Sequence, residues 1–171
     1  MELNTGLGFD FVHSNHLKYS GKKFRLLLSR VFSSFISHSY MPQKMLYGEI
    51  RPIIKNSRDS KNDSNNYRPV MNSCNLLKIF EYCLLPRLQR KIKIDAHQFG
   101  FRKYTSCTTA ISVLKETLLR YTSEGSNVHC AMIDLSKAFD KVNHYVLLCK
   151  LVKTKLPAPI IKILHFMKTN S

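Results

Sequence analysis

The chain has 171 residues, of which 44% are hydrophobic, so it is long enough for one domain with a sizeable core, which argues against disorder throughout. Its 27 Lys and Arg against 11 Asp and Glu give a formal net charge of +16, which indicates a polyanionic partner, with nucleic acid ahead of a membrane surface. The five cysteines are odd in number and form no Cys-x-x-Cys pair, so they indicate reduced, mostly buried thiols in an intracellular protein, nuclear or cytoplasmic, rather than a zinc or dithiol site.

The N-terminal sequence lacks the pattern of a signal peptide, because no basic region is followed by an apolar stretch. No apolar run in the chain approaches the roughly 18 residues that a membrane span requires. We therefore expect no signal peptide, no transmembrane segment and no membrane partner.

The first half of the chain predicts a helix, a hairpin and a second helix. Apolar residues recur at helical spacing from Lys22 and stop before Tyr40. The segment "YGEIRPIIKN" suits a strand, in which Pro52 indicates an edge or a bulge. The loop "NSRDSKNDSNN" has no apolar residue and precedes a second extended piece, "YRPVMNS", so we expect a solvent-exposed hairpin. The following helix contains Pro86, which predicts a kink or break near Leu85.

The second half predicts a loop, a helix, a buried strand and two closing helices. The loop "DAHQFGFRKY" leads to a helix with Thr105 or Ser106 as its N-cap. The apolar run "VHCAMID" suits a strand that is buried on both faces. We expect the last two helices around residues 145–153 and after Pro157.

Asp134 follows that apolar run directly, within "CAMIDLSKAFDKVNH". An aspartate at the end of a buried strand is held rigidly, as two-metal phosphoryl transfer requires of the carboxylates that hold Mg²⁺. The alternative is that Asp134 caps the next helix. For Asp140, six residues later, we expect a structural role, as a cap or in an ion pair with Lys137 or Lys141.

The segment "MIDLSKAFDKVNH" resembles the first catalytic motif of reverse transcriptases of non-LTR (LINE-like) retrotransposons. Upstream, in the family's order, "YGEIRPIIKN", "NYRPVMNSCNLLKIFE" and "QFGFRKYTSCTTAI" resemble its successive fingers and palm motifs, and "HLKY" with "MPQKMLYG" resembles the segment before the fingers. The resemblance implies an α+β right-hand polymerase that is helix-rich, with a fingers β-hairpin and an incomplete antiparallel palm sheet. It divides a single partial domain into a helical lead-in (1–45), a fingers hairpin and helix (46–95) and a partial palm (96–171).

The resemblance also implies roles for individual residues in the palm. Asp134 matches the catalytic, metal-binding aspartate, with the backbone carbonyl of Leu135 as a further ligand of Mg²⁺ or Mn²⁺. Phe139 matches the aromatic residue that presses on the nucleotide sugar and excludes a 2′-hydroxyl, and plain core packing is its alternative.

In the fingers, Lys55 and Arg68 match positions that grip the triphosphate of the incoming dNTP, as a point charge and a bidentate guanidinium can. In "QFGFR", Arg102 is expected to touch template phosphate. Gly100 is expected to permit a backbone angle or a close approach that a side chain would block. The neighbouring Phe99 and Phe101 are expected to pack first and to stack on bases second.

The implied function is RNA-directed DNA polymerase, which extends a DNA primer on an RNA template by two-metal phosphoryl transfer of dNTPs. No Asp-Asp pair occurs in the sequence, so the paired aspartates of a complete enzyme are missing. We therefore expect a fragment that is truncated before that motif and inactive by itself. The alternatives are a non-catalytic remnant that still binds RNA or DNA, and a chain that never folds stably.

Overall fold

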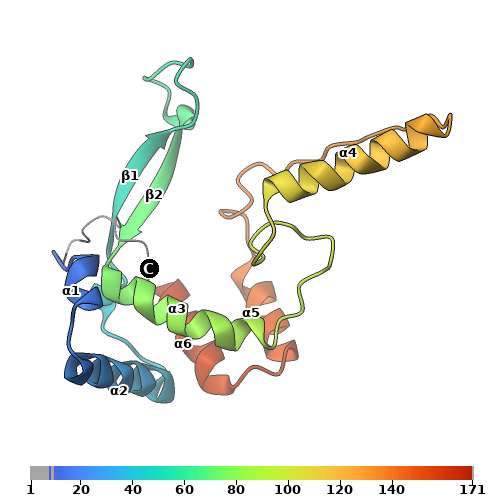
Figure 1. Cartoon of the computed structure of the whole chain (residues 1–171). Helices are drawn as coiled ribbons and strands as arrows, with labels where there is room; N and C mark the ends of the chain where they lie inside the picture. Colours follow the sequence, from blue (N-terminus) through green and yellow to red (C-terminus); the bar gives the residue numbers. More distant parts are fainter. Residues whose placement is uncertain (1–7, 9, 171) are drawn as a thin grey trace. The chain divides into compact units, whose positions relative to one another are not determined.

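The structure, a computed structural model, describes residue 8 and residues 10–170. The chain forms two compact units, which are Met1–Lys91 with Tyr145–Ser171 (unit 1) and Ile92–His144 (unit 2). The described elements are, in chain order, α1 (Ser14–Lys18), α2 (Lys22–His38), η1 (Gln43–Met45), β1 (Gly48–Ile54), η2 (Ser64–Asn66), β2 (Tyr67–Ser73), α3 (Asn75–Gln89), α4 (Cys107–Ser123), α5 (His144–Lys153) and α6 (Ala158–Thr169) (Figure 1). This helix-rich α+β composition confirms the fold class expected from the sequence.

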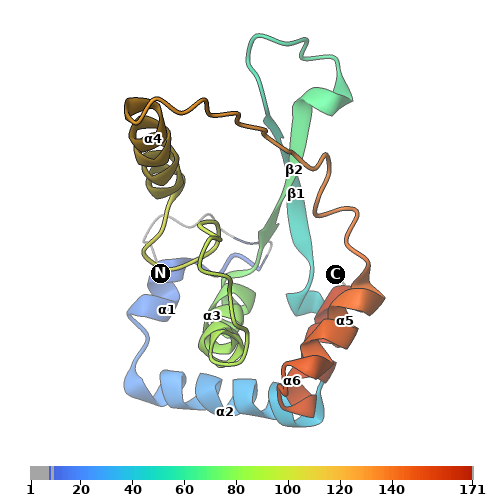
Figure 2. The ribbon, with the colours of Figure 1, turned by 90° about the vertical axis from the view of Figure 1, so that its right-hand side faces the viewer.

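The core of unit 1 lies where α2, α3 and α6 meet. Figure 2 shows α2 running beneath the ends of α3 and α6. Phe32 of α2 and Phe80 of α3 are buried in edge-to-face contact, with ring centroids 5.2 Å apart, and Ile163 of α6 is fully buried with them. Such aromatic contacts stabilise a core beyond the area they bury. The helical spacing of apolar residues in the sequence therefore marked the packing face of α3, which includes Leu77, Phe80 and Leu84. In α2 the expected stripe is wrong in part, because Phe24, Leu27 and Val31 are exposed and Phe32 packs instead.

Helix α3 runs through Pro86 to Gln89 without a break, so the break expected near Leu85 is wrong, and a kink there stays a prediction. The proline falls in the last turn, where its missing N–H removes one intrahelical bond. The carbonyl that loses this bond belongs to Tyr82, whose side chain is exposed, so water can satisfy it. Buried Leu84 holds this part of the helix on the core.

The start of α3 depends on the thiol of Cys74, which is buried. The other four cysteines are exposed or intermediate, so the expectation of mostly buried thiols is wrong. Its Sγ accepts a hydrogen bond from the backbone N–H of Leu77 at 3.4 Å and donates to the carbonyl of Met45 at 3.4 Å. Burial raises the pKa of this thiol above its ordinary value, although the Leu77 N–H acts in the opposite direction. Cys74 therefore stays a neutral thiol that caps a helix.

Strands β1 and β2 form an antiparallel hairpin that projects away from the helices of unit 1 (Figure 1). The backbone N–H of Lys55 donates to the carbonyl of Asn66 at 2.7 Å, which makes this a hydrogen-bonded pair. Hydrogen-bonded and non-hydrogen-bonded pairs alternate along an antiparallel ladder. Pro52, which lies opposite Pro69, therefore belongs to a non-hydrogen-bonded pair, so neither proline removes a bond from the ladder.

Unit 2 contains α4, whose N-cap is Ser106, one of the two residues expected; its hydroxyl accepts from the N–H of Thr109 at 3.3 Å. The strand expected at 128–133 is absent from the described structure, and Ile133 is 91% exposed. A lone extended segment has no neighbour for its backbone groups, and no strand pairs with it here. The expected palm strand is therefore wrong, and the described sheet consists of β1 and β2 alone.

No helix among the described residues combines the length and the apolar character needed to cross a lipid bilayer.

Candidate functional site

Two cations of the hairpin lie on the same face of β1 and β2. In the register, Lys55 is opposite Asn66 and Ile53 is opposite Arg68, so Lys55 and Arg68 are diagonal neighbours. Residues in such positions have Cα atoms about 7–8 Å apart, within the reach of long side chains. The structure therefore brings together the two cations that the sequence singled out.

The ends of both cations are open to an anionic ligand. The ammonium of Lys55 donates to the carbonyl of Asn65 and lies on the exposed surface of the loop. Ion pairs in the described structure join Glu49 to Arg51, Asp95 to His97 and Glu124 to Arg120, and none includes Lys55 or Arg68. The charge of both residues is thus available to a ligand.

Arg51 lies on that same face, opposite Val70 and diagonal to Arg68. Its guanidinium contacts the carboxylate of Glu49 at 2.9 Å, and both side chains are more than half exposed. Exposed pairs of this kind contribute little to stability. The face therefore continues as a basic surface from Lys55 and Arg68 toward the base of the hairpin, where Glu49 is its one acid.

The side chain of Asn66 holds the tip of the hairpin, and sequence reasoning missed it. Asn66 is only 6% exposed. Its Oδ1 accepts from the N–H of Asn56 at 3.1 Å, and its Nδ2 donates to the carbonyls of Asn56 at 3.0 Å and Ser60 at 3.3 Å. This amide is thus paired on both sides, and it fixes the loop that lies between the two cations.

In unit 2, Asp134 is exposed, and its Oδ1 accepts from the N–H of Leu135 at 2.9 Å. It does not cap a helix, because residues 136–141 are turns and α5 begins only at His144. The capping alternative is therefore wrong. Asp140 is in none of the described ion pairs, and its backbone N–H donates to the carbonyl of Lys137 at 3.1 Å, so the expected ion pair is wrong too.

Phe139 and Phe101 make an edge-to-face contact, with ring centroids 6.2 Å apart and an angle of 86° between the ring planes. The two side chains are 76% and 87% exposed, so the alternative of core packing is wrong for Phe139, and Phe101 packs against Phe139 outside any core. Sequence reasoning did not foresee this contact, which joins the "QFGFR" segment to the segment that contains Asp134. The contact leaves most of both aromatic surfaces open to a base or a sugar.

The loop that carries Gly100 and Arg102 is held by local hydrogen bonds. Arg102 Nη1 donates to the carbonyl of Ala96 at 3.0 Å, and Gln98 Nε2 donates to the carbonyl of Gly100 at 3.0 Å. A Cβ at position 100 would meet no atom within 4 Å, and the left-handed residues of the loop are Phe101, with φ 57°, and Tyr104, with φ 64°. Gly100 therefore has neither the backbone angle nor the close approach of another segment that was expected to require glycine, so that expectation is wrong within the chain. The open space at position 100 faces outward.

An acid begins this same loop. The N–H and the imidazole of His97 both donate to Asp95, and these bonds lower the pKa of that carboxyl below its ordinary value, with a smaller contribution from the charge of Arg102. Asp95 is thus ionised, and its negative charge balances part of the positive charge of the loop.

The described residues do not fit a two-metal centre. No group of three or more His, Cys, Asp or Glu side chains that could hold an ion occurs in residue 8 and residues 10–170. Asp134 provides one carboxylate oxygen donor and Leu135 a carbonyl, whereas Mg²⁺ requires near-octahedral oxygen coordination. Further ligands are needed before these two residues can hold a pair of ions.

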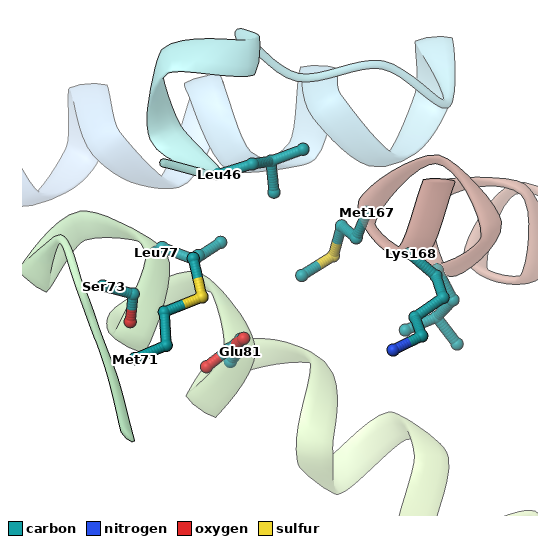
Figure 3. A pocket seen from close by; sticks show the side chains of 8 residues that line it. Leu46, Met71, Ser73, Leu77, Glu81, Met167 and Lys168 are labelled. Carbon is teal, nitrogen blue, oxygen red and sulfur yellow. The ribbon is translucent and has the colours of Figure 1, made fainter. Parts of the chain in front are cut away.

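A hollow of about 380 Å³ lies at the foot of the hairpin in unit 1 (Figure 3). Leu46, Leu77 and Met167 are apolar residues of its lining, and Glu81 and Lys168 are the charged residues of the lining. Desolvation raises the pKa of the Glu81 carboxyl, although the charge of Lys78 acts in the opposite direction. This hollow contains none of the residues that the sequence predicted for the site.

Comparisons with known proteins bear on the motifs in these segments. Residues 55–171, more than half of the chain, match the family described as reverse transcriptase (RNA-dependent DNA polymerase). Two curated relatives from Drosophila melanogaster are each 28% identical, namely the probable RNA-directed DNA polymerases from transposon BS, over 169 residues, and from transposon X-element, over 167 residues. The alignments cover 96% and 94% of this chain, which spans 18% of the length of each relative. The expected resemblance is confirmed, and the chain belongs to the reverse transcriptase (RNA-dependent DNA polymerase) family.

Proposed function

We propose that this chain is part of an RNA-directed DNA polymerase of a retrotransposon, which adds dNTPs to a DNA primer on an RNA template. Family membership and the names of the two Drosophila relatives support this function. In this proposal residues 46–95 contribute the fingers and residues 96–171 the first part of the palm. An intracellular location, nuclear or cytoplasmic, fits the five cysteines, all of which are free thiols.

The observation that carries the proposal is the diagonal placement of Lys55 and Arg68 on one face of the hairpin. Lysine offers a compact point charge, and arginine offers a planar fork that donates two hydrogen bonds to one phosphate group. With no described carboxylate paired to either cation, a triphosphate can accept from both without displacing an acid. The buried Asn66 keeps the loop between them fixed, which lowers the entropy cost of binding.

In unit 2, we assign Phe139 to the nucleotide sugar, and Arg102 with Gly100 to the nucleic-acid backbone. The exposure of Phe139 and the open space at Gly100 support these roles. Reverse transcriptases generally use divalent metals, and we assign Asp134 with the Leu135 carbonyl as ligands of Mg²⁺ or Mn²⁺. Because the chain has no further carboxylate cluster in its described part, we propose that the 171-residue chain binds substrates without incorporating nucleotides.

Binding of a fluorescent dNTP analogue to the purified chain tests the hairpin. Lys55→Gln and Arg68→Gln should each weaken binding about tenfold, since a charge-assisted hydrogen bond contributes about 1.5–3 kcal/mol. Arg58→Gln is the matched control, because it removes an exposed cation of the same loop whose side chain makes no ion pair in the described structure. Equal weakening in all three variants would reduce the proposal to non-specific attraction by a chain of charge +16.

Primer extension on an RNA template with Mg²⁺ or Mn²⁺ tests the palm. We expect no incorporation by the 171-residue chain. Incorporation that disappears in Asp134→Ala would support the assignment of Asp134 and overturn the proposed inactivity. Incorporation that survives Asp134→Ala would reject Asp134 as a catalytic ligand.

A further inference from the structure

A second hollow of unit 1, of about 320 Å³, lies among α1, α2 and α3 and contains none of the residues proposed above to bind nucleotide. Its half-buried apolar side chains are Leu17, Leu28, Ile36 and Ile79, whereas Phe32 and Phe80, which also line it, are buried in the core. Two arginines, Arg25 of α2 and Arg87 of α3, line it as well. A hollow that combines an apolar surface with a few polar groups, in this range of volume, is the usual form of a small-molecule site.

Both guanidinium groups are held in place by backbone carbonyls. Arg25 donates from Nε to Ser20 at 3.1 Å and from Nη2 to Lys18 at 3.2 Å, and Arg87 donates from Nη1 to Cys83 at 2.5 Å. These bonds leave further N–H donors of each fork unused. A fixed cation loses little side-chain entropy when it binds a ligand, so the two arginines are preorganised.

The hollow has a positive charge that nothing in the described structure balances. Its lining contains no Asp or Glu, and neither Arg25 nor Arg87 takes part in a described ion pair. The hydroxyls of Ser20, Ser29 and Ser33 are the remaining polar side chains of the lining. A ligand that fits this hollow therefore has a negative charge to pair with the arginines and an apolar part to contact the rest of the lining.

We propose that this hollow binds a small amphiphilic anion, an aryl carboxylate or a compound of that class, with the ring against Leu28, Ile36 and Ile79 and the anionic group between Arg25 and Arg87. A nucleic-acid strand fits less well, because its charge is repeated along a backbone while the hollow offers two cations over an apolar surface. The proposal is independent of the polymerase function, since it uses none of the hairpin or palm residues.

Titration with 2-naphthoate, compared with the neutral 2-naphthamide of the same ring system, tests the proposal. We expect saturable 1:1 binding of the anion and about tenfold weaker binding of the amide. Arg25→Gln and Arg87→Gln should each weaken naphthoate binding about tenfold and leave naphthamide binding unchanged. Arg30→Gln is the matched control, because Arg30 is an exposed cation of α2 outside the hollow.

Protection of Cys83 from alkylation locates the ligand independently. Cys83 lines the hollow and is exposed, whereas Cys107 and Cys130 are exposed cysteines of unit 2. Saturating 2-naphthoate should slow iodoacetamide labelling of Cys83 several-fold, while labelling of Cys107 and Cys130 keeps its rate. Mass spectrometry of the digested protein measures all three sites in one sample.

Several outcomes would overturn the proposal. Equal affinity for naphthoate and naphthamide would remove the role of charge, and equal weakening by Arg30→Gln would reduce binding to the net charge of the chain. Uniform slowing at all three cysteines, or no saturable binding, would place the ligand elsewhere. If an oligonucleotide displaces naphthoate, and this displacement requires Arg25 and Arg87, the hollow would be assigned to nucleic acid instead.

Discussion

Pro52 and Pro69 lie directly opposite each other in the hairpin, in a pair that exchanges no backbone hydrogen bonds. In such a pair the backbone N–H positions point outward, toward the two free edges of the sheet. Proline has no N–H to offer there. The two prolines therefore leave the pairing of β1 with β2 intact and remove a donor from each exposed edge, where another strand could otherwise add.

Restoring these donors should promote self-association. Pro52→Val and Pro69→Val together place an outward N–H on each edge of a strand pair that carries exposed apolar residues. Sedimentation velocity at increasing protein concentration should show more dimer and higher species for the double variant than for the parent. Ile53→Val is the control, because the N–H of residue 53 points toward β2. An unchanged monomer fraction in the double variant would contradict the protective role of the prolines.

Removing the amide of Asn66 should unfold the hairpin tip. Asn66→Ala leaves the backbone N–H and carbonyl of Asn56 without their partners, which costs about 1–3 kcal/mol. Urea unfolding followed by circular dichroism measures the loss. Asn62→Ala is the matched control, since that exposed asparagine of the same loop uses only its backbone N–H in the described hydrogen bond to Ser60. Equal midpoints for the two variants would show that the amide of Asn66 does not hold the tip.

The carboxyl of Glu81 should make stability depend on pH. Its folded pKa is raised by desolvation above the ordinary value of 4.5, so the folded chain binds its proton more tightly than the unfolded chain. This contribution to stability is present below about pH 4.5 and is lost as the pH rises through the folded pKa. Glu81→Gln should therefore raise the thermal midpoint at pH 7 and flatten its fall above pH 4.5.

Thermal melts between about pH 4 and 8 test this linkage. Glu116→Gln, on the exposed α4, controls for the change in net charge. A Glu81→Gln variant whose midpoint runs parallel to that of the parent across this range would contradict the role of desolvation.

Backbone amides of α4 should exchange with solvent far faster than those of α3. None of the buried hydrophobic residues of the described chain belongs to unit 2, whereas α3 contributes Leu77, Phe80 and Leu84 to the core. A helix of this length without tertiary packing is marginal in water. Hydrogen exchange read by mass spectrometry should show early exchange at 107–123 and late exchange at 75–89, and equal protection of both helices would contradict it.

The helices and the hairpin could be predicted from the sequence because their signals are local. Helical spacing of apolar residues gave α2 and α4, and a loop without apolar residues between two extended segments gave β1 and β2. The strand expected at 128–133 is absent, and its absence could not be predicted, because an apolar run does not reveal whether a neighbouring strand exists to pair with it. The expected break at Pro86 was wrong for a related reason, since the free-energy cost of a proline depends on its position in the helix.

The candidate site was predicted in part. Motif order placed Lys55 and Arg68 in the fingers, and the observed register puts them on one face. The contact of Phe101 with Phe139 joins residues far apart in sequence, so no local pattern could have shown it. Asn66 had a weak signal, as an asparagine of a polar loop directly before a strand, but its burial depends on the fold of the loop.

The sulfur atom of Cys74 ties the two ends of the hairpin together, because it bonds the carbonyl of Met45, just before β1, and begins α3, just after β2. Each strand has seven residues, so the hairpin is a lever about 23 Å long. A rotation of about 10° at its base moves the tip by about 4 Å, which is more than the length of a hydrogen bond. This one buried thiol thus anchors the base of the hairpin whose far end carries Lys55 and Arg68.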